Sequence, residues 1–246
     1  IRMVFKDVNS GFYLERKTGL YAATGDEVAR AGEALGIVAS ACMNLDRGCG
    51  TLRQTNDITL DFCRAKSWRY PVLRLLPPGY PDEFYTREEI VRLASEEKAL
   101  FRICPGQDAS PLTPWMFGWM FEVLAETKTP LLVSLQELDL RDAAAVKEAY
   151  PGLRLVITNT TQWMNRQYIR FAQYYKEVYF DTSNIIEYYG IENIVNLIGA
   201  ERILFGTYMP EKEPYDKVFQ LLYCELSEEQ KQLIAHGNFE RLVEER

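Results

Sequence analysis

Three carboxylates and one arginine lie in or directly after short apolar runs, where side chains with a chemical role often occur. Asp7 follows MVFK, Glu137 follows PLLVSLQ, Asp181 follows VYF, and Arg102 lies within ALFRIC. A carboxylate can take a proton from water, and a guanidinium can hold an anionic substrate. If the fold brings these four side chains to one rim, they indicate hydrolysis of a small anionic molecule.

Composition restricts the chemistry of histidine and cysteine. His236 is the single histidine among 246 residues, so every zinc site that needs two or more imidazoles is excluded. Gly237 and Asn238 follow it as a helix stop, so we expect a last-turn histidine favoured by the helix dipole. The cysteines are widely spaced, odd in number and without a C-x-x-C pair, which favours free thiols over a disulfide framework. They are Cys42, Cys49, Cys63, Cys104 and Cys224.

Charge and hydropathy exclude several classes of partner. The chain has 28 Lys and Arg against 35 Asp and Glu, a net charge of −7, which does not fit a nucleic-acid or polybasic membrane surface. No apolar run approaches the roughly 20 residues of a membrane span, and the first residues, IRMVFKDVNS, lack the apolar core of a signal peptide. We therefore expect a cytoplasmic protein that binds a small molecule, with no nucleic acid and no membrane as partner.

Short apolar runs alternate with segments of helical spacing, and this alternation predicts parallel βαβ units. Eight units in a chain of this length fit a single-domain (β/α)8 TIM barrel over residues 1–246 better than the alternative, a doubly wound open sheet. Thr24 with Glu27, and Thr86 before REEIVRLASEE, are helix start signals. The segment from Tyr215 onward has no strand pattern and should add two or three helices. The predicted strands are Met3–Val8, Ile37–Ala41, Pro71–Leu76, Ala99–Cys104, Pro130–Leu135, Leu153–Thr158, Val178–Thr182 and Ile203–Thr207.

The loops after the strands build the active site of a TIM barrel, so the residues that close each strand are candidates for substrate contact. They are polar and include no imidazole. Asp7 and Asp181 also have a structural explanation, since each could accept backbone N–H groups at a strand-to-helix turn. The candidates for substrate binding are Asn9, Arg102, Ser134, Gln136, Asn159, Asn184 and Tyr208.

Two aromatic features have structural explanations. PWMFGWMF, residues 114–121, is apolar on all sides, which is typical of a buried helix and not of a cofactor site. Trp163 and several tyrosines are expected to cover the barrel, and a homo-oligomeric interface is the alternative.

The most specific pattern lies near the end of the chain. Residues 202–210 read RILFGTYMP, and LSEEQKQLIAH is followed by GNFERL at residues 237–242. These phrases resemble the last strand and helices of amidohydrolase-related TIM-barrel proteins, the metal-dependent hydrolases of the amidohydrolase-2 type. FKDVNSGF, PGLRLVITNT and VYFDTSNI fall in the family's order and spacing. The resemblance runs along most of the chain and implies a TIM-barrel hydrolase.

The metal ligands that this resemblance implies are missing. The family's first strand carries Asp-x-His-x-His, and this chain keeps the aspartate as Asp7. The side chains at the other positions cannot replace four histidines and an aspartate around zinc, so we expect no catalytic metal and no other cofactor. The two first-strand histidines, the fifth- and sixth-strand histidines and the eighth-strand aspartate are replaced by Asn9, Gly11, Ser134, Asn159 and Tyr208.

Three functions remain open. The first is a metal-independent hydrolase of a small, anionic or cyclic ester or amide, with a carboxylate as general base and Arg102 as the anion-binding group. The second is a catalytically silent barrel that binds a small molecule or serves as a subunit, because every metal ligand is lost at once. The third is a magnesium or manganese enzyme with an all-oxygen site of Asp7, Glu137 and Asp181.

Overall fold

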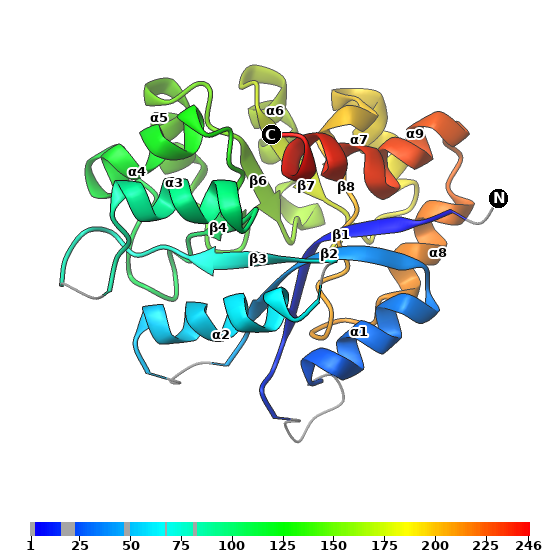
Figure 1. The fold of residues 1–246 in the computed structure, drawn as a ribbon. Helices are drawn as coiled ribbons and strands as arrows, with labels where there is room; N and C mark the ends of the chain where they lie inside the picture. Colours follow the sequence, from blue (N-terminus) through cyan, green and yellow to red (C-terminus); the bar gives the residue numbers. More distant parts are fainter. Residues whose placement is uncertain (1–2, 16–22, 47–49, 67, 81–82) are drawn as a thin grey trace.

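Eight parallel strands form one barrel, each hydrogen-bonded to the next in chain order (Figure 1). The computed structural model describes residues 3–15, 23–46, 50–66, 68–80 and 83–246. Helices follow the strands and cover the outside of the barrel, so the predicted (β/α)8 TIM barrel is confirmed, and the doubly wound sheet is wrong. The strands are β1 (Phe5–Phe12), β2 (Ile37–Asn44), β3 (Arg69–Arg74), β4 (Leu100–Arg102), β5 (Leu131–Ser134), β6 (Leu155–Thr158), β7 (Val178–Asp181) and β8 (Ile203–Leu204).

The helices begin where the sequence signals predict. Thr24 and Glu27 form a capping box at α1, and Thr86 and Glu89 form another at α3, so the first N–H groups of both helices are satisfied by side chains. The helices are α1 (Gly25–Ala34), α2 (Leu52–Arg64), α3 (Arg87–Glu96), α4 (Pro114–Glu126), α5 (Leu140–Ala149), α6 (Asn165–Tyr174), α7 (Gly190–Ile198), α8 (Tyr215–Tyr223) and α9 (Glu228–Gln232).

The first strand is longer than predicted. β1 runs to Phe12 and not to Val8, because an irregularity in its pairing with β2 between Asp7 and Ser10 lets the polar residues continue the strand. Asn9 therefore lies inside a strand and not after one.

Backbone hydrogen bonds between the first strand and the segment after β8 close the barrel. Val8 N donates to Phe205 O at 2.9 Å, Tyr208 N donates to Asn9 O at 2.7 Å, and Gly11 N donates to Met209 O at 2.7 Å. The side chains of Asp7 and Thr207 add a fully buried contact across this seam, 2.5 Å between Oδ2 and Oγ1. The two ends of the sheet are thus joined through residues about 200 positions apart.

The last residues cover the amino ends of the strands. After α9, wide helical turns at Leu233–Gly237 and Glu240–Glu244 place Leu242 and Val243 in the cluster that fills the barrel interior. Glu244 accepts hydrogen bonds from Lys6 Nζ at 2.7 Å and Tyr70 OH at 2.8 Å, both near the start of a strand. The predicted C-terminal helices are confirmed, and the carboxyl ends of the strands are left for a site.

Two aromatic predictions are wrong in part. Phe117, Met120 and Phe121 of α4 are buried as expected, but Trp115 in its first turn is 76% exposed. Trp163 is 86% exposed and does not cover the barrel. None of the described helices has the length and apolar composition that crossing a bilayer requires.

The Asp7–Thr207 contact gives a first prediction. Thr207→Val removes a buried hydroxyl that donates to Asp7 Oδ2 and accepts from Met209 N, so it should lower the free energy of unfolding by about 2–4 kcal/mol. Urea denaturation measures this loss. Thr207→Ser keeps the hydroxyl and should lose much less; equal losses for the two variants would contradict the hydrogen-bond explanation.

Candidate functional site

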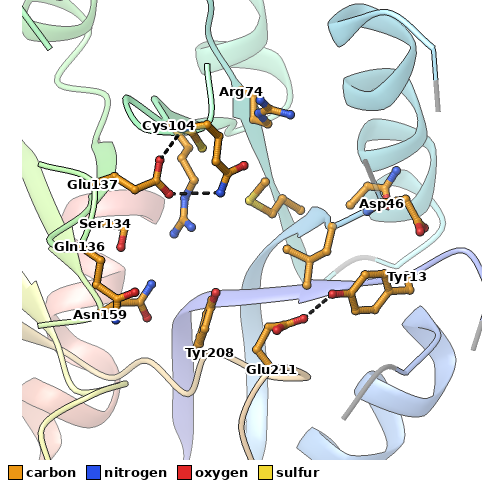
Figure 2. A pocket seen from close by; sticks show the side chains of 15 residues that line it. Tyr13, Asp46, Arg74, Cys104, Ser134, Gln136, Glu137, Asn159, Tyr208 and Glu211 are labelled. Atoms are coloured by element: carbon orange, nitrogen blue, oxygen red, sulfur yellow. Dashed lines mark hydrogen bonds between the residues drawn. The ribbon is translucent and has the colours of Figure 1, made fainter. Parts of the chain in front are cut away.

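A polar cavity of about 510 Å³ opens at the carboxyl ends of the strands (Figure 2). β2, β3, β4 and β5 each contribute the residue that ends the strand, namely Asn44, Arg74, Arg102 and Ser134. The lining is mostly polar, and the volume suits a small organic molecule. The lining residues are Tyr13, Met43, Asn44, Leu45, Asp46, Arg74, Arg102, Cys104, Gln107, Ser134, Gln136, Glu137, Asn159, Tyr208 and Glu211.

Arg102 is a buried cation that has no carboxylate partner among the described residues. Its side chain is at the end of β4, the residue is 8% exposed, and no described Asp or Glu oxygen lies within 4.0 Å of its nitrogens. Nη2 donates to Asn9 Oδ1 at 2.8 Å, while Nε is buried and has no hydrogen-bond partner among the described residues. Burial of an unpaired charge is costly, so this position favours an anion in the adjoining cavity.

An amide links Arg102 to a buried carboxylate beneath the cavity. Asn9 Nδ2 donates to Asp181 Oδ2 at 2.7 Å, while Asn9 Oδ1 accepts from Arg102. Asn159 N donates to Asp181 Oδ1 at 3.0 Å, and Ser183 Oγ donates to Asn159 Oδ1 at 3.0 Å. Burial raises the pKa of Asp181, and hydrogen bonds from Ser183, Asn9 and Asn159 with the charge of Arg102 oppose that rise.

Asp7 is also fully buried, and its carboxylate is engaged with the barrel seam. Oδ1 accepts from the backbone N–H groups of Asn9 at 2.9 Å and Thr207 at 3.2 Å, and Oδ2 accepts from the Thr207 hydroxyl. Desolvation raises the pKa of Asp7 to about 7, although these hydrogen bonds favour the ionised form. Asp7 does not line the cavity.

Glu137 lines the cavity and anchors a loop. Oε2 accepts from the backbone N–H groups of Gly106 at 3.1 Å and Gln107 at 3.2 Å, and Oε1 accepts from Gln107 Nε2 at 3.1 Å. The loop between β4 and α4 is thereby tied to the end of β5. Among the described residues, no three His, Cys, Asp or Glu side chains converge on a point where a metal ion would fit, so Asp7, Glu137 and Asp181 do not form the all-oxygen site.

The structure separates the sequence-predicted residues into four places. Asp7 lies at the barrel seam and does not line the cavity. Asn9 lies in the hydrogen-bond network with Asp181, below the cavity. Asn184 lies outside the cavity and accepts a hydrogen bond from Lys212. Six line the cavity itself: Arg102, Ser134, Gln136, Glu137, Asn159 and Tyr208.

Sequence reasoning missed several lining residues. Arg74 ends β3, whereas the predicted strand continues to Leu76, so the rule for strand-closing residues does not select it; its charge pairs with Asp108. Tyr13 was missed because the first strand was predicted too short, and its hydroxyl donates to Glu211. Glu211 lies in a loop without a sequence signal.

Comparison with known proteins agrees with this fold. The sequence pattern of the amidohydrolase family matches residues 12–244, almost the entire chain. This chain belongs to the amidohydrolase family. No curated protein matches its sequence.

Solved structures of several decarboxylases are similar to this chain at low identity. A 2,6-dihydroxybenzoate decarboxylase from Rhizobium superposes with a TM-score of 0.75 at 15% identity, over 98% of this chain and 99% of that one. A 5-carboxyvanillate decarboxylase from Sphingomonas paucimobilis gives 0.77 at 11%, over 98% and 99%. The 5-carboxyvanillate decarboxylase of Novosphingobium aromaticivorans, solved with manganese and a nitrobenzoic acid, gives 0.75 at 14%, over 98% and 96%. At these identities the likeness establishes the fold alone.

The residues of this chain do not fit a divalent metal such as the manganese in the Novosphingobium structure. Asn9 and Asn159 are engaged with Asp181, and Arg102 brings a positive charge to the amide that stands at the first histidine position. A side chain at Gly11 would begin 2.6 Å from Leu45 Cγ, so Leu45 occupies the space that a second imidazole needs. The donor set therefore disagrees with a divalent ion.

The raised pKa of Asp7 predicts a pH dependence of stability. The folded protein holds a proton up to a pH of about 7 that the unfolded chain releases near 3.8, so the free energy of unfolding falls as the pH rises through this window. The loss reaches up to about 4 kcal/mol. Asp7→Asn should flatten the slope measured by urea denaturation between pH 4 and 8, leaving the part due to Asp181. An unchanged slope in that variant would assign the titration elsewhere.

The donor set also predicts the metal content. Protein purified without a nickel column should hold far less than one equivalent of zinc, manganese or iron by elemental mass spectrometry, because amide, hydroxyl and phenol groups are poor ligands for these ions. Addition of a chelator should leave its thermal midpoint unchanged. A retained full equivalent would show that our ligand assignment is wrong.

Proposed function

We propose that this chain binds a small carboxylate-bearing molecule in the cavity at the mouth of its barrel, with Arg102 as the anchor. The supporting observation is the buried guanidinium of Arg102, which has no carboxylate partner among the described residues and lines the cavity. A bound carboxylate would give this cation its counter-charge and would accept N–H groups in a fork geometry.

The rest of the cavity supports a polar, compact ligand. Asn159, Ser134 and Tyr208 offer hydrogen-bond donors and acceptors, and Met43 and Leu45 provide a smaller apolar surface. The similar structures bind or act on benzoic acids, as their names state, and these are the probes that we choose. The ligand class is thus a hydroxylated ring or short chain with one carboxylate.

Metal-free hydrolysis of an anionic ester, lactone or amide is the second candidate. It is favoured by Glu137, the one of the three proposed catalytic carboxylates that lines the same cavity as Arg102. Glu137 would act as general base on water while Arg102 holds the substrate's anionic group. Asp7 and Asp181 are fully buried and engaged in hydrogen bonds, so neither is placed to meet a substrate in the cavity.

Isothermal titration calorimetry with 2,6-dihydroxybenzoate tests the proposal. Resorcinol, which has the same hydroxylated ring without the carboxylate, is the control ligand. The wild-type chain should bind the acid and not resorcinol. Arg102→Met should raise the dissociation constant at least about tenfold, which corresponds to the loss of one charge-assisted hydrogen bond. Arg102→Lys keeps a positive charge and should raise the dissociation constant less.

The matched control is Arg87→Met, since Arg87 pairs with Glu122 and Glu126 on the surface away from the cavity. Undiminished binding in a folded Arg102→Met variant would contradict the proposal. Turnover of a carboxylate-bearing aryl ester, present in the wild type and lost in Glu137→Gln, would support hydrolysis over binding alone.

A further inference from the structure

A pair of cysteines lies in the wall of the barrel, outside the mouth cavity. Cys42 is near the end of β2 and Cys63 is in the last turn of α2, and their Sγ atoms are 3.6 Å apart. The residues are 1% and 5% exposed and pack with Phe12. Cys104 and Cys224 are also buried, but no other described thiol lies close to either of them.

Beside this pair lies a second buried arginine that has no described hydrogen-bond partner for its guanidinium. Arg69, the first residue of β3, is 6% exposed, and all three of its guanidinium nitrogens are buried without a hydrogen-bond partner among the described residues. Its guanidinium carbon lies 3.7 Å from the centre of the Trp68 ring, which covers one face. A buried guanidinium is stabilised by a nearby anion, and the groups that its charge reaches are Cys42, Asp7, Cys63 and Glu33.

The two thiols are unequal. The hydrogen bond from Cys63 and the charge of Arg69 lower the pKa of Cys42 against its desolvation. The same hydrogen bond and burial raise the pKa of Cys63. Cys42 is therefore the more acidic thiol of the pair, and Cys63 holds its proton more tightly.

We propose that Cys42 and Cys63 form a reversible intrachain disulfide on exposure to a small peroxide, with Arg69 holding Cys42 as the reacting thiolate. The Cys42 sulfur attacks one oxygen of hydrogen peroxide, the O–O bond breaks, and water leaves after protonation, which produces a sulfenic acid. The Cys63 thiol then attacks that sulfur, the S–O bond breaks, a disulfide forms and a second water leaves. Two thiols are oxidised by two electrons, and one peroxide is reduced to two waters.

The contact distance is compatible with this bond. A disulfide needs the sulfurs about 2.05 Å apart, so they must approach by about 1.5 Å through rotation of two side chains on packed elements. Hydrogen peroxide is small enough to reach buried thiols through local opening, whereas a bulky disulfide oxidant is not.

The crosslink would join two elements that support the cavity. α2 holds the ends of the neighbouring strands, because Asn44 N donates to Thr59 Oγ1 at 3.0 Å and Asn56 Nδ2 donates to Arg74 O at 2.9 Å. A bond from Cys63 to Cys42 would fix this helix to β2, two residues before Asn44.

The test treats the folded, full-length chain with hydrogen peroxide, removes the oxidant, alkylates the remaining thiols in urea and digests the protein unreduced with trypsin. Cleavage after Arg47 and Arg53 separates the Cys42 peptide, 31–47, from the Cys63 peptide, 54–64, with Cys49 in a third. We expect the Cys42 and Cys63 peptides to be found as one crosslinked species, with the sum of their masses less two hydrogen atoms. Dithiothreitol should separate them again.

Variants separate the roles of the three residues. Cys63→Ser should leave a sulfenic acid on Cys42 that dimedone traps, and Cys42→Ser should give neither product. Arg69→Met should slow crosslinking at least about tenfold relative to Arg69→Lys, since the thiolate loses its cation. Two results would overturn the proposal. One is crosslinking of Cys42 and Cys63 only after unfolding in urea, and the other is a bond from Cys63 to Cys49 instead of Cys42 in the folded chain.

Discussion

The positive charge of Arg102, held at the end of β4 with no described carboxylate in contact, sets the character of the barrel mouth. The carboxylate of Asp181 balances this charge only through an intervening amide, because Asn9 accepts from Arg102 with its amide oxygen and donates to Asp181 with its amide nitrogen. The orientation of this one amide is fixed from both ends, by a cation that needs an acceptor and an anion that needs a donor. The charge of Arg102 and the hydrogen bonds from Asn9, Asn159 and Ser183 favour the ionised form of Asp181 against the effect of its burial.

The same network occupies the positions at which the family resemblance places imidazoles. Metal ligands converge on a small volume, and their loss would leave buried polar groups without partners. Here the substituted side chains satisfy one another: Asn9, Asn159 and Ser183 enclose Asp181, and Leu45 fills the space beside Gly11. The polar groups of Asn9, Asn159 and Ser183 are thus engaged in hydrogen bonds around Asp181, which leaves few free donor atoms for a metal.

The sequence predicts the barrel better than the site. Alternating apolar runs and capping boxes such as Thr24 with Glu27 depend on local chemistry, so the order of strands and helices follows from them. The true extent of β1 does not, because Asn9 and Ser10 enter the strand through an irregular pairing with β2 that only the assembled sheet creates. The sequence indicates Glu137 as a residue after a strand end, and Glu137 lines the cavity, but its contacts with the loop around Gln107 depend on tertiary geometry. The pairing of Cys42 with Cys63 could not be read from their spacing, since it requires the packing of α2 on β2.

Closure of the barrel through residues about 200 positions apart has a consequence for synthesis. The edge of β1 is made early, but its partners from Phe205 to Met209 leave the ribosome only after almost the whole chain. At about 5–20 residues per second, the edge waits roughly 10–40 s without its final hydrogen bonds. An unpaired strand edge invites pairing with other chains, and charged residues reduce that hazard. Lys6 and Asp7, side by side on β1, place two charges on the strand during this interval, before the first is bound by the C-terminal turns and the second by Thr207.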